Sequence, residues 1–319
     1  MNRRTGTLIS AVAFLACFST GQSLYGQDAS TTQRITVVGE EVPSAYGATP
    51  SFSRSRFSNL TQAYVLPPGA MFAGLIYQGD ALMFNRPDHR FTQEFEIGLP
   101  NRFGLAVENT IENFRGRTQE RTVSVEARYA FADWNQIPLN PTIFVEYKFG
   151  IGHILHDEGP PEPLPKGEAE EFLSEHEPLP DAYELRLLLA QDFSNNMEWA
   201  ANIFFEQEIG GDRGREVGVA SSLMFPSLLP HERLKLGIET QYTAFTDSGI
   251  RMEGEPRSDR WVIGPTVAWK PSKNTRVDVS PLFGITHDAP RASVFVVFSM
   301  LFGGAESPQA EAPASTRNR

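Results

Sequence analysis

Apolar and polar residues alternate along most of this chain, and this pattern limits the folds open to it more than any other feature. Between about residue 70 and Phe302, segments of roughly 10 to 14 residues are apolar at every second position and are separated by turn signals. In residues 121–131, for example, Val123 and Val125 share one face, whereas Ser124 and Glu126 share the other. The pattern predicts strands that begin near residues 70, 91, 103, 120, 141, 181, 197, 214, 233, 259, 275 and 292.

Three features indicate that these strands cross a membrane instead of forming a soluble β-sandwich. Trp261 and Trp269 lie on one face of a strand, and eight residues at a tilt of ~40° span about 20 Å, near the height of an outer-membrane apolar band. Short connections alternate with the long polar segments 156–180 and 246–258. The last strand is apolar at alternate positions and ends in Phe302. We expect an all-β, antiparallel up-and-down barrel of about 12 strands, with a soluble periplasmic β-protein as the alternative.

The N-terminus has the features of a cleaved signal peptide. Arg3 and Arg4 precede an apolar run, Leu8 to Phe18, which is shorter than the ~20 residues of a membrane-spanning helix. We therefore predict a signal peptide (1–27), a periplasmic N-terminal extension (28–66), an outer-membrane barrel (67–303) and a polar C-terminal tail (304–319). The single cysteine, Cys17, lies in the leader, so lipidation there is an open alternative and a disulfide framework is excluded.

The charged residues of the sequence indicate the chemistry of the barrel's interior. The formal net charge of the chain is −11, which argues against a nucleic-acid partner. If the apolar faces meet lipid, the opposite faces line a lumen that is richer in acids than in bases. The residues expected to set selectivity there are Glu94, Glu96, Glu108, Glu126, Arg128, Glu146, Lys148, Arg186, Glu206, Glu208, Glu239 and Arg276.

An acid-rich lumen favours cations or neutral polar solutes over anions. We expect a channel or transporter for small solutes. The alternative is a structural or surface-binding barrel whose lumen is blocked by paired charges, because opposite charges on neighbouring strands stabilise pairing by about 0.2–1 kcal/mol. Expected partners are outer-membrane lipids, small solutes and the barrel-assembly machinery.

Motifs typical of catalysis and of metal binding are absent from the sequence. It has no nucleophile elbow, phosphate loop or His-Glu-x-x-His motif, and no enzyme activity is expected. Glu108 and Glu112, four residues apart on one strand, would stand about 13 Å from one another, too far for a glycosidase pair. His153, His156 and the acids that follow match no defined zinc spacing, so neither a metal site nor a cofactor is predicted.

The hairpin from Glu94 to Glu108 contains Gly98-Leu99-Pro100-Asn101-Arg102 between two alternating strands with glutamates on the polar face. It resembles the transporter family of the meta-pathway of phenol degradation, over about residues 70–302. The resemblance implies a small outer-membrane barrel with a transport role, and it carries over no binding residues.

Overall fold

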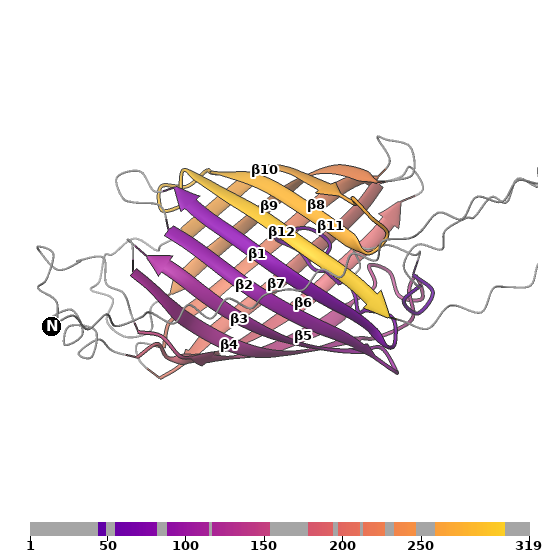
Figure 1. Ribbon diagram of the computed structural model, residues 1–319, viewed down its shortest axis with the longest axis horizontal. Helices are drawn as coiled ribbons and strands as arrows, with labels where there is room; N and C mark the ends of the chain where they lie inside the picture. The colour runs from indigo at the N-terminus through magenta and orange to yellow at the C-terminus, as the bar shows by residue number, and fades with distance from the viewer. Residues whose placement is uncertain are drawn as a thin grey trace, which may run out of the picture. The chain divides into compact units, whose positions relative to one another are not determined.

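The computed structural model describes residues 44–48, 55–81, 88–114, 117–153, 178–193, 197–210, 213–226, 233–246 and 259–303. Within these residues the chain forms twelve strands (Figure 1). They are β1 (Ala70–Ala81), β2 (Asp88–Leu99), β3 (Phe103–Phe114), β4 (Arg117–Ala130), β5 (Thr142–Gly150), β6 (Asp181–Phe193), β7 (Met197–Ile209), β8 (Arg215–Pro226), β9 (Leu234–Thr246), β10 (Asp259–Trp269), β11 (Thr275–Gly284) and β12 (Ala292–Gly303). Each begins within three residues of its predicted position.

The strands form a closed antiparallel barrel. Each strand pairs with its neighbours in sequence, and β1 closes the barrel against β12 in a register that runs from Ala70 opposite Gly303 to Ala81 opposite Ala292. Closure pairs the backbone N–H and C=O groups of both end strands, so the sheet has no free edge. The predicted barrel class and strand number are therefore confirmed.

The two faces of the strands have opposite chemistry, with polar side chains inside. On β9, Glu239 is fully buried (0% exposed), whereas its neighbour Ile238 is 53% exposed on the outer surface. On β4 the same contrast separates Glu126 (1%) from Val125 (47%). A soluble sandwich would bury the apolar faces, so the soluble alternative is wrong, and the outer surface is the kind that lipid covers.

Aromatic side chains occupy both ends of the outer surface. Trp261 and Trp269 are 43% and 50% exposed near opposite ends of β10, as the spacing predicted. Phe298 and Phe302 of β12 also point outward. None of the described residues forms a helix that is long and apolar enough to cross a membrane.

We call the barrel end where β1 begins and β12 ends the base, and the opposite end the mouth. At the base, residues 55–66, here called the inner segment, enter the barrel before β1 begins. Residues 28–66 were predicted to form a periplasmic extension, and residues 55–66 of that stretch lie inside the barrel at its base. Residues 1–43 and the tail from 304 lie outside the described part of the chain.

Apolar packing holds the inner segment at the base. Phe57, Tyr64 and Val65 are buried in one cluster with Trp134 and Met224 of the barrel. The Tyr64 and Trp134 rings meet edge to face at 5.1 Å, and the Tyr64 hydroxyl donates to the Ala132 carbonyl at 2.7 Å. Burial, together with the negative charge of Asp133, raises the pKa of the Tyr64 hydroxyl, which keeps it protonated as a donor.

Candidate functional site

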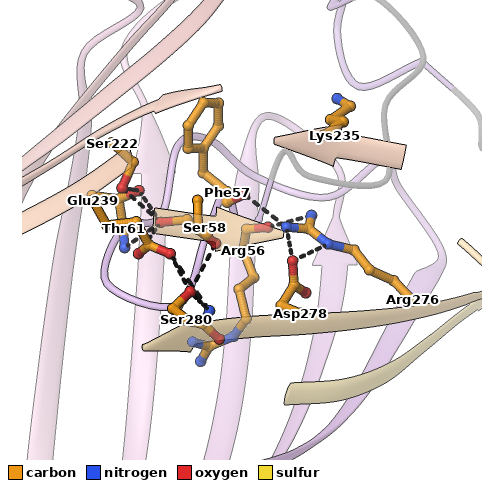
Figure 2. A network of polar contacts seen from close by, with 12 residues as sticks. Arg56, Phe57, Ser58, Thr61, Ser222, Lys235, Glu239, Arg276, Asp278 and Ser280 are labelled. Atoms are coloured by element: carbon orange, nitrogen blue, oxygen red, sulfur yellow. Dashed lines mark hydrogen bonds and ion pairs between the residues drawn. The ribbon is translucent and has the colours of Figure 1, made fainter. Parts of the chain in front are cut away.

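Polar side chains of the barrel wall bind the inner segment deep in the lumen (Figure 2). Glu239 of β9 accepts hydrogen bonds from the Ser58 hydroxyl at 2.7 Å and from the Leu60 backbone N–H at 2.8 Å. Ser58 also lies 2.7 Å from the hydroxyl of Ser222 on β8. An irregular backbone inside a barrel cannot join the ladder, so the wall side chains satisfy its polar groups instead.

Asn202 of β7 binds the same segment through a reciprocal pair of bonds. Its side-chain oxygen accepts from the Gln62 backbone N–H at 2.8 Å, and its side-chain nitrogen donates to the Gln62 carbonyl at 2.7 Å. The side chain thereby imitates one rung of a β-ladder. Residues 58–62 are thus held from β7, β8 and β9 at once.

Arg276 of β11 clamps the segment from another strand (Figure 2). Its guanidinium donates to the backbone carbonyls of Arg56 at 3.1 Å and Phe57 at 2.8 Å. The same group forms an ion pair with Asp278 at 2.6 Å, which fixes its orientation. The sequence predicted Arg276 as a lumen residue, but not that it would bind the chain's own backbone.

A group of charged residues, which we call the lower cluster, joins the inner segment to β2, β3 and β4. Its members are Arg56, Glu94, Glu96, Glu108, Glu126 and Arg128. Arg56 pairs with Glu94 at 2.6 Å, and Arg128 pairs with Glu96 at 3.2 Å and with Glu126. Arg128 also donates to the Ser55 carbonyl at 3.2 Å. Side chains of the wall and of the segment therefore neutralise one another in part.

A second charged group, the upper cluster, lies on β5, β6 and β7. Its members are Glu146, Lys148, Glu184, Arg186 and Glu206. The Lys148 ammonium lies 2.8 Å from Glu184 and 2.5 Å from Glu206, and Arg186 pairs with Glu184. The Arg186 guanidinium also lies 4.7 Å from the centre of the Phe144 ring, within cation–π range.

A polar cavity of about 530 Å³ occupies the lumen on the mouth side of the inner segment. Asn59, Leu60, Thr61 and Gln62 line it from the segment. Its wall carries seven acids and six bases, counting Arg56: Asp80, Glu108, Glu146, Glu184, Glu206, Glu208 and Glu216, against Arg56, Arg90, Arg121, Lys148, Arg186 and Arg260. The expected acid excess is therefore one residue in this cavity, whereas the lower cluster contains four acids and two bases.

The structure places all twelve predicted lumen residues on the inner face of the barrel. Eleven of them fall into the two clusters, the Glu239 contact or the Arg276 clamp, as described above. Glu108 also lines the cavity, and Glu208 accepts a hydrogen bond from the Gly214 N–H at 2.9 Å. Their role in selectivity remains a prediction.

Of the six basic residues of the cavity, Lys148 and Arg186 were predicted to set selectivity, and Arg260 has the parity of an inner-face residue on its predicted strand. The other three were not predicted from the sequence. Arg90 was overlooked because β2 begins at Asp88, before the predicted start. Arg121 has the wrong parity for the inner face, but a register shift between Thr110 and Ile111 lies beside it, and one extra residue reverses which side chains point inward. Arg56 belongs to the inner segment, where no alternating pattern exists.

Several solved structures are similar to this chain. A KdgM porin in complex with disordered oligogalacturonate is 12% identical, with a TM-score of 0.42, over 72% of this chain and 99% of that one. The NanC porin is 8% identical, with a TM-score of 0.44, over 74% and 100%. The COG4313 outer membrane channel from Pseudomonas putida F1 is 11% identical, with a TM-score of 0.44, over 75% and 97%.

No family model matches the sequence, and no curated protein matches it. The resemblance to the phenol-degradation transporter family therefore stays a prediction. Of the loop residues weighed for metal binding, His153 is described, whereas residues 154–177, which include His156, His176 and the acids between them, lie outside the described residues.

Proposed function

We propose that this protein is an outer-membrane channel for small polar solutes, closed on its base side by the inner segment. The base would face the periplasm, because both ends of the barrel sequence lie there and the longest connections lie at the mouth. Export through a cleaved signal peptide, insertion by the barrel-assembly machinery and contact with outer-membrane lipids belong to the same proposal.

The proposal rests on the way in which the inner segment divides the lumen. A cavity of about 530 Å³ with a charged wall ends on Asn59, Leu60 and Thr61. These residues are not part of the sheet, and hydrogen bonds to wall side chains hold them. Such bonds can be exchanged for bonds to water, so the segment can leave its position without any strand of the barrel unpairing.

The proposal is tested by locking the segment in place. Ser58 and Ser222 have hydroxyl oxygens 2.7 Å apart, so the double variant S58C/S222C should form a disulfide. The leader-free protein has no other cysteine, because Cys17 lies within the predicted leader. In a planar bilayer we expect a low conductance from the oxidised protein and a higher, fluctuating conductance after reduction.

The single variant S58C is the matched control, and its conductance should not depend on the reductant.

A specific observation favours the alternative of a structural barrel, because Phe57, Ala63, Tyr64 and Val65 complete an apolar core at the base. Silence from the correctly folded, reduced double variant and from the wild-type protein would refute the channel and leave that alternative. Steady conductance that is equal in both redox states would show that the segment does not close the pore.

For selectivity we propose a preference for cations and neutral polar solutes. The upper cluster and its neighbours Glu208 and Glu216 hold five acids and two bases on one side of the cavity. This excess of acids on one wall supports the preference more strongly than the smaller excess of acids over the whole cavity does.

A further inference from the structure

Three glutamates of the lower cluster meet at one level of the lumen. Glu94 of β2 lies directly opposite Glu108 of β3 in the register, and Glu126 of β4 lies diagonally from Glu108. One carboxylate oxygen from each of the three lies within 4.8 Å of the others. Like charges on directly opposed residues destabilise a strand pair, so this arrangement calls for a compensating positive charge.

The arginines present supply only part of that charge. The lower cluster contains four carboxylates and two guanidiniums, which leaves a net charge of −2 when every group is ionised. Arg56 binds Glu94, and Arg128 binds Glu96 and Glu126 and lies 3.6 Å from Glu94. The side chains of Glu94, Glu96 and Glu126 are at most 1% exposed, so water screens the residual charge poorly.

Unsatisfied oxygens in the same cluster point to a ligand independently of the charge count. The Oε2 atom of Glu126 and the Oε1 atoms of Glu94 and Glu96 are buried and have no hydrogen-bond partner among the described residues. The one unsatisfied donor of the cluster, Arg128 Nη2, lies 3.6 Å from Glu94 Oε1, beyond hydrogen-bond distance. The other oxygen of Glu126 is bound by Arg128. Buried carboxylate oxygens are normally paired, and where no hydrogen-bond donor reaches them, a bound cation can take the donor's place.

We propose that Glu94, Glu108 and Glu126 bind a divalent cation, and that calcium fits best. Calcium takes oxygen ligands at about 2.3–2.6 Å, so two ligands of one ion can stand up to about 5 Å apart, which accommodates three oxygens that lie within 4.8 Å of one another. Magnesium demands near-ideal octahedral geometry and usually keeps several waters, so a mostly buried group of three carboxylates suits it less well than calcium. A charge of +2 would also neutralise the cluster.

One of the three proposed ligands borders the lumen cavity on its mouth side. Glu108 and Arg56 line the 530 Å³ cavity, whereas Glu94 and Glu126 are buried and are not part of its lining. An ion in the cavity therefore meets Glu108 first, and water in the cavity can complete its coordination. A bound ion would join β2, β3 and β4 next to the Arg56–Glu94 pair. No metal site was expected from the sequence, because no single strand contains the ligands.

The test is calcium binding to the full leader-free protein, refolded in detergent and stripped with a chelator. Equilibrium dialysis against radioactive calcium in about 0.15 M KCl suppresses diffuse attraction to the acidic surface. We expect one saturable ion per barrel. E108Q and E126Q should each weaken binding by about tenfold or more, since each removes a ligand.

E216Q is the matched control, because it makes the same change at another acid of the cavity, on β8. Its affinity should stay within about twofold of wild type, since it is no ligand. Equal weakening in all three variants, or no saturable binding to wild type at millimolar calcium, would overturn the site. Heat-modifiable mobility verifies that each variant is folded.

A measurement on the wild-type protein alone guards against variants that do not fold. Calcium should raise the thermal unfolding midpoint relative to chelator, and equimolar magnesium should raise it less. An identical midpoint in calcium and chelator would overturn the proposal. The site does not depend on the channel function, because an impermeable barrel would bind the ion equally well.

Discussion

Replacing Glu239 by alanine should release the inner segment from the barrel wall. The Glu239 carboxylate accepts two short hydrogen bonds from that segment, from Ser58 and from the Leu60 N–H, and a longer one of 3.5 Å from the Asn59 side chain. Ser58 keeps Ser222 as a partner, but among the described residues the Leu60 N–H has no second acceptor. At about 1.5–3 kcal/mol for each bond to a carboxylate, docking of the segment should weaken by about 3–6 kcal/mol.

Such a loss should appear as protease access. One factor of ten in an equilibrium corresponds to about 1.4 kcal/mol, so the undocked population should rise at least about a hundredfold. Trypsin cleaves after arginine, and in the docked state Arg56 is held against Glu94 inside the barrel. When undocking is fast relative to cleavage, the rate of cleavage after Arg56, followed by mass spectrometry, reports the undocked population directly.

Glu198→Ala is the matched control. This carboxylate also lies inside the barrel, and it binds Lys235 at 2.7 Å. Trypsin should cleave the E198A protein after Arg56 at nearly the wild-type rate. Equal rates for E239A and wild type would refute the reasoning, because they would show that the wall contacts of Glu239 do not hold the segment.

Three further perturbations test the lumen and the outer surface. The double variant E206K/E208K should move the reversal potential in a salt gradient toward anion selectivity, and an unchanged potential would exclude this wall as the selectivity element. I238R places a charge on the lipid-facing surface and should destabilise the barrel in liposomes by up to about 2–4 kcal/mol, so an unchanged unfolding midpoint would contradict lipid contact there. R128M leaves Glu96 and Glu126 without their guanidinium and should lower the unfolding free energy in urea by about 3–5 kcal/mol, whereas a more stable variant would show that the pair costs more to bury than it returns.

The strands and the direction of their faces were predictable because the signal is local. A neighbouring pair such as Ile238 and Glu239 indicates which face of its strand is apolar and which lines the lumen. The repetition of this pattern over twelve segments indicates the barrel. The same parity placed Glu94, Glu96 and Arg128 inside. It failed at Arg121, where a register shift that no local pattern announces reverses the alternation.

The contents of the lumen were not predictable in this way. Residues 55–66 lack alternation because wall side chains, instead of a neighbouring strand, satisfy their backbone, and the sequence alone therefore suggested an extension outside the barrel. The partners of Glu239 at Ser58 and Leu60 lie about 180 residues away in the chain. Only closure of the barrel brings them together.

The sequence by itself thus indicated the barrel, its strand number and, away from the register shift beside Arg121, which strand side chains face inward, since each follows from a two-residue period. The tertiary structure decided which inward groups meet. Strand register sets Glu108 against Glu94, and barrel closure sets the inner segment against β7, β8, β9 and β11. These contacts join residues far apart in sequence, so their energies depend on register and closure, which a local repeat does not encode.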